Sequence, residues 1–229
     1  MTLEPVEEAT SLDKLAYDKI KDAILTFHFL PNQALIEGEL AEQLRISKTP
    51  VRDALMRLEK EELVTRVPFK GTYVSDVNNQ DMADIYEIRS VLEGLAIRMA
   101  VNNLTDEDFA RMDKLIEDHD KALKQKEVAV VSNINSEFHS IIIQKCPNAR
   151  LRKYLYQLDD QLKRYRLLSI AQGVRLEKSI PEHKAILNAL KERDALKAEE
   201  AMKDHLISAM KDLYTQDFTE LEQLLLKNQ

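Results

Sequence analysis

Residues 37–58 constrain the fold of this chain most strongly, because their apolar side chains are spaced for two short helices with a tight turn between them. The first helix is predicted over Glu37–Leu44, and a three-residue turn follows it. Ser47 can then cap a second helix over Lys48–Lys60, in which Pro50 falls in the first turn, where proline is tolerated. The residues expected to pack the two helices together are Leu40, Ala41, Leu44, Ile46, Val51, Leu55 and Leu58. This pattern predicts a helix-turn-helix.

The sequence on either side completes a winged version of this motif. Before it, apolar residues at helical spacing predict a helix from about Leu12 to Phe29, which Pro31 then ends. After it, two β-rich runs at 63–67 and 72–75 flank a Pro/Gly turn, which predicts a β-hairpin. Three helices followed by a hairpin predict a winged helix-turn-helix DNA-binding domain over residues 1–75.

The rest of the chain is predicted to be helical. Residues 76–80 are polar and are expected to form a linker, and residues 81–229 are expected to fold as an antiparallel helical bundle. Thr105 and Asp108 are spaced as a capping box at the start of one bundle helix. The predicted helices span 81–102, 105–125, 127–145, 148–171, 178–191 and 193–214, with a short tail helix to about 226. The predicted fold class is therefore mainly α.

Composition narrows the class of protein. The 229 residues carry a formal net charge of −7, so the surface as a whole is not expected to bind nucleic acid indiscriminately. Residues 45–70, in contrast, contain seven basic and four acidic side chains, the confined positive face that a DNA-reading module needs. A single cysteine, no signal-peptide pattern and no apolar run of about 20 residues predict a cytoplasmic protein without a membrane partner.

The N-terminal end of the second helix carries the side chains that are expected to read DNA. Lys48 and Arg52 can donate to guanine or to phosphate, and Ser47 and Thr49 can reach phosphate oxygens. The positive end of the helix dipole also favours phosphate. The predicted partner is therefore a double-stranded DNA operator.

The hairpin tip is expected to approach the adjacent minor groove through Lys70 and Gly71, because glycine permits close backbone contact.

The segments ISKTPVRDALMRLEKEELV and VPFKGTYVSDV resemble the recognition segment and the wing of the GntR family of bacterial regulators. The resemblance implies DNA contacts at the residues just named. The chain departs from the family at Lys48 and Gly38, where the family has Arg, and at Arg45, where it often has Gly. Arg45 is expected to add a phosphate contact.

Three of the five histidines form a pattern that suits a metal ion. Asn135 and His139 are four residues apart and so project from one helix face. His183 and His205 lie on two consecutive helices that must run antiparallel. Three imidazoles that converge inside a bundle can bind a divalent transition metal and leave positions open for water or a ligand. The alternative is that all three are ordinary core or surface histidines.

Four segments, IRSVLEGLAIRMA, NSEFHSII, PEHKAILNALKERD and AMKDHLISAM, are similar to the FCD effector domain of the FadR-type GntR branch, over residues 81–215. Many members of that branch bind a metal through an Asp and three His. The resemblance implies a ligand set of Asn135, His139, His183 and His205. Asn135 stands where the family has Asp, so an amide oxygen replaces a carboxylate. Zn is the expected metal, with Ni or Mn as alternatives. His28 and His119 match none of these positions and are interpreted as structural or surface residues.

The same resemblance implies a small organic acid, often metal-bound, as the effector. Arg89 and Glu93 lie four residues apart on the first bundle helix and can form an ion pair. Alternatively, Arg89 faces the cavity and binds the carboxylate of the effector. Both interpretations stay open, and Arg164 and Arg166 are weaker candidates for the same role.

The sequence therefore predicts a transcriptional regulator, by family expectation a repressor, that binds a near-palindromic operator as a homodimer. An alternative hypothesis makes the divalent cation itself the signal. A metalloenzyme built on the helical bundle is less favoured, because the sequence contains no HExxH motif, no P-loop and no repeated Glu-x-x-His motif. The chain is expected not to be an enzyme.

Overall fold

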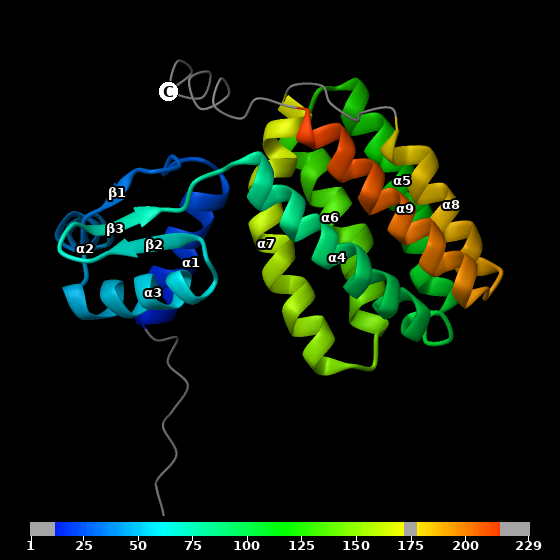
Figure 1. The fold of residues 1–229 in the computed structure, drawn as a ribbon, viewed down its shortest axis with the longest axis horizontal. Helices are drawn as coiled ribbons and strands as arrows, with labels where there is room; N and C mark the ends of the chain where they lie inside the picture. Colours follow the sequence, from blue (N-terminus) through cyan, green and yellow to red (C-terminus); the bar gives the residue numbers. More distant parts are fainter. Residues whose placement is uncertain (1–11, 172–177, 216–229) are drawn as a thin grey trace, which may run out of the picture. The chain divides into compact units, whose positions relative to one another are not determined.

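The computed structural model describes residues 12–171 and 178–215. The chain divides into two compact units, which meet between Asp76 and Val77 (Figure 1). Helices dominate both units, and a small antiparallel sheet lies in the first, so the predicted mainly α fold is confirmed. The predicted tail helix to about 226 lies outside the described residues.

The first unit has the elements of a winged helix-turn-helix. In chain order they are α1 (Leu12–Leu25), β1 (Ala34–Leu35), α2 (Glu37–Leu44), α3 (Lys48–Lys60), β2 (Val64–Val67) and β3 (Gly71–Val74). The strands pair antiparallel in the order β1-β3-β2, with Ala34 opposite Tyr73 and Val64 opposite Val74. The β2–β3 hairpin is the predicted wing. The sequence does not predict β1, because two residues are too few to show an alternating pattern.

Helix α1 ends four residues earlier than the sequence predicts, at Leu25 and not at Phe29. Phe27 adopts a left-handed backbone conformation with φ of 60°, and the Phe29 amide donates to the carbonyl of Ala23 at 3.0 Å. This geometry closes the C-terminus of the helix. The Phe27 side chain is nevertheless buried, so the apolar spacing continues beyond the last helical residue and makes the predicted helix too long.

A polar cluster fastens α1 to α3. The Tyr17 hydroxyl donates to the Glu61 carboxylate at 2.7 Å, and the Lys21 ammonium lies 2.9 Å from the same carboxylate. The Arg57 guanidinium lies 3.7 Å from the centroid of the Tyr17 ring. Beside this cluster, Val51, Leu55 and Leu58 are fully buried. The polar cluster and the apolar packing together hold α3 against the core of the first unit. They therefore fix the orientation of the exposed face of α3.

The second unit contains six helices in the described residues. They are α4 (Asn79–Ala100), α5 (Asp106–Lys124), α6 (Val128–Lys145), α7 (Ala149–Ala171), α8 (Ser179–Lys191) and α9 (Ala195–Tyr214). Each end lies within two residues of the predicted one. The predicted capping box is confirmed, since Thr105 and Asp108 bond to each other's backbone amides. The predicted linker is too long, because the Asn78 side chain accepts from the Asp81 amide at 2.9 Å and so starts α4 at Asn79.

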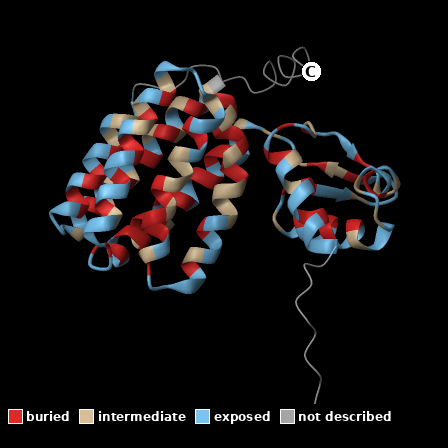
Figure 2. Cartoon of the chain, turned by 180° about the vertical axis from the view of Figure 1, so that it is seen from behind, coloured by how far each residue is buried: buried red, intermediate tan, exposed pale blue. Residues whose placement is uncertain are grey.

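Helix α4 lies at the centre of this unit and packs against α6, α7 and α9. Gly94 allows α9 to approach closely, because a Cβ atom at that position would lie 2.7 Å from the Lys203 side chain. Burial alternates with exposure along each helix (Figure 2). The buried side of α4 carries both apolar residues and the charged pair Arg89 and Glu93. The bundle core is therefore not purely apolar.

The turn between α2 and α3 gives a test of local strain. Arg45 ends α2 in a left-handed conformation, with φ of 56°, and the Ile46 amide donates to Ala41 at 3.0 Å in a Schellman arrangement. Because glycine adopts this conformation without strain, Arg45→Gly is expected to raise the free energy of unfolding by about 0.5–1 kcal/mol. Urea denaturation of the full chain, followed by circular dichroism, measures the change.

The control is Glu42→Gly in the same helix, which should lower the free energy of unfolding by up to about 1 kcal/mol. A loss of stability in Arg45→Gly would show that the Arg45 side chain makes a contact that outweighs the backbone strain.

Candidate functional site

The residues predicted to contact DNA all lie exposed on the first unit. They are Arg45, Ser47, Lys48, Thr49, Arg52, Lys70 and Gly71. Ser47 occupies the N-cap position of α3, but its side chain makes no cap hydrogen bond, so the hydroxyl can serve a phosphate. Arg52 pairs with Glu37 of α2, with Nη2 and Oε2 2.8 Å apart. An exposed pair of this kind contributes about 0–1 kcal/mol, so DNA can displace Glu37.

The wing tip presents one residue that the sequence does not single out. Phe69 is fully exposed, at 110%, and has a left-handed backbone with φ of 64°. Gly71 follows with φ of 122°, a conformation that side chains rarely adopt, and this explains why glycine stands there. The Pro-Phe-Lys-Gly run identifies the turn, but it does not show that an aromatic ring points into solvent.

Three histidines from three helices converge in the second unit. His139 of α6, His183 of α8 and His205 of α9 are buried, and one ring nitrogen of each lies within 4.8 Å of those of the other two. Two ligand atoms at about 2.1 Å from one ion lie at most about 4.2 Å apart, so small ring movements suffice to complete a site. The close packing of α8 and α9 brings the rings of His183 and His205 to a centroid distance of 4.7 Å.

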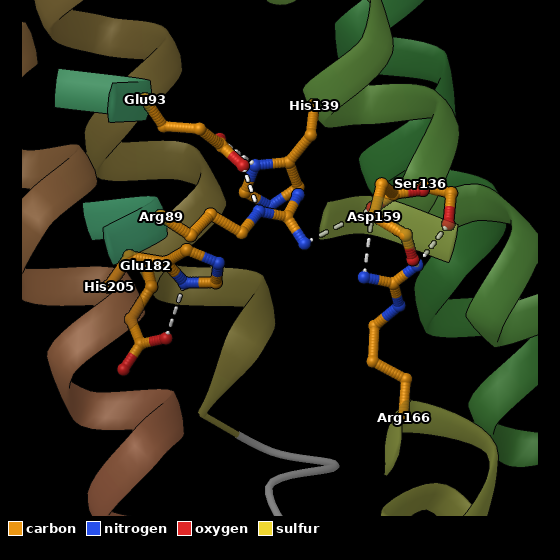
Figure 3. A network of polar contacts seen from close by, with 8 residues as sticks. All are labelled: Arg89, Glu93, Ser136, His139, Asp159, Arg166, Glu182 and His205. Carbon is orange, nitrogen blue, oxygen red and sulfur yellow. Dashed lines mark hydrogen bonds and ion pairs between the residues drawn. The ribbon is translucent and has the colours of Figure 1, made fainter. Parts of the chain in front are cut away.

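Two carboxylates orient two of these rings, those of His139 and His205 (Figure 3). Glu93 of α4 contacts His139 Nδ1 at 2.6 Å, and Glu182 of α8 contacts His205 Nδ1 at 2.8 Å. Ser208 donates to the other oxygen of Glu182 at 2.8 Å. A histidine whose Nδ1 is held by a carboxylate presents Nε2 as a metal donor and gains basicity. The donor set therefore fits a divalent transition metal.

Glu93 stays charged although it is only 1% exposed. Burial alone raises the pKa of this carboxyl group, but the charges of Arg89 and His139 outweigh burial and hold the pKa far below its usual range. The carboxylate accepts from both partners, since Arg89 Nε also contacts Oε1. Glu93 is therefore a permanent negative charge behind the histidine cluster.

A cavity of about 60 Å³ opens beside the histidines. Its polar lining consists of Tyr86, Arg89, His119, Asn135, His139, Arg166, Ser169, Ser179 and His205. Asn135, the predicted fourth ligand, lies on this lining one turn before His139. His119, interpreted from the sequence as structural or surface, is buried there, and burial lowers its pKa to about 4, so the ring is neutral near pH 7. His28, in contrast, is exposed on the first unit.

Arg89 takes part in both of the interactions that the sequence left open. It pairs with Glu93, and it also lines the cavity, where its Nη2 has no hydrogen-bond partner among the described residues. Its Nη1 lies 3.1 Å from Asp159 Oδ1 of α7. Arg166 Nη1 lies 2.9 Å from the same oxygen, and Arg166 Nη2 donates to Ser136 at 2.6 Å (Figure 3). Two guanidinium groups thus share one carboxylate at the cavity wall.

Two functional residues, Glu182 and Asp159, were not predicted from the sequence. Glu182 directly precedes His183, yet its partner is His205 on the following helix, which local spacing does not reveal. Asp159 stands seven residues before Arg166 on the same face of α7, and this spacing was the available signal. Arg164, the other weak candidate, is buried but does not line the cavity.

Comparison with known proteins identifies the family. Residues 12–74 match bacterial regulatory proteins of the gntR family, and residues 84–208 match the FCD domain. The chain belongs to the GntR family and carries an FCD domain. Proteins of this family are DNA-binding transcriptional regulators and not enzymes.

Two relatives and one solved structure agree with this assignment. The HTH-type transcriptional regulator McbR of Escherichia coli is 31% identical over 166 residues, which are 72% of this chain and 75% of McbR. The HTH-type transcriptional repressor GlaR of the same bacterium is 29% identical over 211 residues, which are 87% of this chain and 93% of GlaR. The structure of E. coli McbR/YncC matches with a TM-score of 0.77 and 27% identity, over 91% of this chain and 99% of that one.

Two departures from the GntR pattern meet in space. A Cβ atom at Gly38 would lie 3.6 Å from Nζ of Lys48, so the lysine side chain extends over the glycine. An arginine at position 38 would compete with Lys48 for this room. Lysine also offers a point charge where arginine offers a planar fork of donors. This GntR regulator therefore presents one compact charge at positions 38 and 48.

In the described part of this GntR regulator, no helix is long and apolar enough to cross a membrane. This finding agrees with the lack of a long apolar run in the sequence.

Glu182→Gln tests the role of the carboxylates behind the histidines. The substitution keeps the shape of the side chain but weakens its hold on His205, and the loss of such a carboxylate typically lowers metal affinity about 10–100-fold. Competition for Zn²⁺ against a chromophoric chelator measures the dissociation constant. Glu137→Gln is the matched control, because Glu137 pairs with Arg111 on the surface. Equal Zn²⁺ affinity for Glu182→Gln and the unmodified protein would contradict this role.

Proposed function

We propose that this protein is a homodimeric transcriptional repressor whose operator binding is relieved by a small carboxylic acid bound together with a divalent metal in the FCD domain. The observation that carries the proposal is a cavity lined by two buried arginines and by His139 and His205, each of which a carboxylate orients. His183 lies beside them and completes a cluster of three histidines. Imidazoles bind a transition metal, and guanidinium groups bind a carboxylate in a bidentate manner. The named function of the relative GlaR, a transcriptional repressor, supports the sign of regulation.

The metal would be held by His139, His183 and His205, with Asn135 on the same cavity wall. Bound there, a divalent cation would supply a Lewis-acidic centre with positions open to an oxygen ligand. Asn135 brings no negative charge, so the four ligand side chains do not themselves neutralise the ion. We infer that Zn²⁺ is the preferred ion, because imidazole nitrogen suits it.

The charges around the cavity favour an acid that binds only with the metal. Among the described residues, two guanidinium groups, of Arg89 and Arg166, face three carboxylates, of Glu93, Asp159 and Glu182. Counted without the histidines, these five side chains have a net charge of −1, which does not favour an anion. A divalent cation would change this net charge to +1. The acid therefore requires the metal.

A second candidate function is a metal sensor, and the small cavity favours it. By the measure that allots roughly 10–15 Å³ to one water, 60 Å³ holds about five water molecules. That room suits an ion with its water ligands, or an ion with an acid of a few carbon atoms. The two functions differ in whether the metal alone changes operator binding.

Operator binding of the full chain separates these functions. An operator duplex is first selected from random DNA by repeated binding, and its affinity is measured by fluorescence anisotropy with chelator, with Zn²⁺, and with Zn²⁺ plus acetate or malonate. The proposed function predicts that acid with Zn²⁺ weakens operator binding about 5–150-fold, and that chelator abolishes the response. An equal change with Zn²⁺ alone would identify a metal sensor. Operator binding that is indifferent to chelator, metal and acid would contradict both functions.

An apolar stripe on α4 supports the homodimer. Ile88 and Val91 are 53% and 62% exposed, and Met99 is 36% exposed, while Leu92 and Leu95 between them are partly buried. These positions recur at helical spacing on one side of the helix. Exposed apolar residues in a contiguous row mark an interface in many proteins. We infer that α4 packs against its counterpart in a second copy, which would place two recognition helices on one operator.

Val91→Glu tests this interface. A charge in the centre of an apolar interface is unfavourable, so the dimer dissociation constant should rise at least about tenfold. Analytical ultracentrifugation measures it. Val130→Glu on α6, at 44% exposure, is the matched control and should leave the dimer intact. If Val91→Glu leaves the dissociation constant unchanged, the interface lies elsewhere.

A further inference from the structure

We propose that Asp159 is an internal substitute for the effector: its carboxylate occupies the guanidinium pair of Arg89 and Arg166, and the carboxylate of the acid replaces it. The inference rests on the proposed function, because it specifies how the acid enters the FCD cavity. It assigns a role to a residue on α7 that belongs neither to the histidine cluster nor to its supporting carboxylates.

The contacts of Asp159 with the two arginines are close but poorly aligned. Its Oδ1 lies 3.1 Å from Arg89 Nη1 and 2.9 Å from Arg166 Nη1. Within the described residues, neither Oδ1 nor Arg166 Nη1 has a partner in hydrogen-bond geometry. A carboxylate in bidentate geometry with a guanidinium group forms two parallel hydrogen bonds. Asp159 does not have this geometry with either arginine. A free acid can therefore bind the pair better than Asp159 does.

Both arginines keep donors unused at the cavity. Arg89 is 1% exposed and Arg166 is 7% exposed, and both line the cavity. In the described part of the chain, Arg89 Nη2 and Arg166 Nε make no hydrogen bond. Buried donors without partners are unfavourable, and a ligand oxygen that reaches them gains affinity. The unused donors show where the oxygens of an acid fit.

The exposed fractions of the Asp159 and Glu93 side chains indicate which of the two carboxylates the acid displaces. The Asp159 side chain is 21% exposed, whereas the Glu93 side chain is 1% exposed. A displaced carboxylate must regain hydration, and the partly exposed Asp159 side chain lies closer to solvent than the enclosed Glu93 side chain. An exchange of one carboxylate for another also keeps the charge around the arginines balanced. An acid added beside Asp159 would instead place three carboxylates, with Glu93, around two guanidinium groups.

Replacement of the Asp159 carboxylate by the acid would also affect the packing of two helices. The contact of Arg89 with Asp159 is an ion pair between α4 and α7. Replacement of Asp159 removes that ion pair. Helix α4 begins at Asn79, three residues after the first unit ends at Asp76. Acid binding would thus loosen the helix that follows the DNA-binding unit in the chain.

Asp159→Asn tests the proposal, because the amide keeps the shape of the side chain and removes its charge. Isothermal titration of acetate and of malonate into the Zn²⁺-loaded full chain should show an affinity about tenfold higher for Asp159→Asn than for the unmodified protein. Asp113→Asn is the matched control, since Asp113 pairs with Lys191 on the surface, and it should leave the affinity unchanged.

A second variant covers the case in which Asp159→Asn does not fold, as judged by circular dichroism. Arg166→Gln should weaken acid binding about tenfold, because it removes one half of the guanidinium pair. Unchanged affinity in Arg166→Gln would overturn the inference.

The outcomes separate this inference from the proposed function. Equal or lower acid affinity in folded Asp159→Asn overturns the inference alone, because the unmodified protein still binds acid. If neither protein binds either acid, the inference and the carboxylate part of the proposed function are both wrong. Acid binding by Asp159→Asn but not by the unmodified protein supports competition by Asp159 and contradicts the carboxylate part of the proposed function.

Discussion

The second unit is organised around the charge of Glu93, which lies inside the bundle at 1% exposure. A buried carboxylate is strongly unfavourable unless it is paired and hydrogen-bonded, and Arg89 and His139 meet this need. The Arg89 charge in turn requires Asp159. These linked ion pairs hold α4, α6 and α7 together. Because well-packed apolar residues would stabilise a bundle equally well, we attribute the network to binding and not to stability.

The sequence predicts the helices of the second unit to within two residues, because each has a continuous apolar stripe and a polar break at its ends. It fails where burial and helical backbone diverge, as at Phe27, which is buried although α1 has ended. The histidine cluster was predictable from spacing and family resemblance. The contact of Glu182 with His205 was not predictable, because it joins two helices whose approach only tertiary packing sets. The spacing of Asp159 and Arg166 on α7 was a signal, but the contact of Asp159 with Arg89 on α4 depends on tertiary packing.

DNA binding and the proposed effector binding use charges in opposite environments. Lys48, Arg52 and Lys70 are exposed, so their attraction to phosphate is screened by salt and falls steeply as ionic strength rises. Arg89 and Arg166 are buried, where screening is slight and an unpaired charge is strongly unfavourable. Exposed charges therefore suit reversible binding to a polyanion, and buried charges suit selection of one small anion.

The positions of the histidines along the chain affect the order in which the two units can fold during synthesis on the ribosome. The DNA-binding unit ends at Asp76, whereas His205 lies on the last described helix, α9. At roughly 5–20 residues per second, the ribosome needs on the order of ten seconds to synthesise the intervening segment. During this interval a nascent chain can fold its recognition helix before the histidine cluster exists. In the proposed homodimer two DNA-binding units bind one operator, so an unfinished chain with a single unit lacks the avidity of the pair.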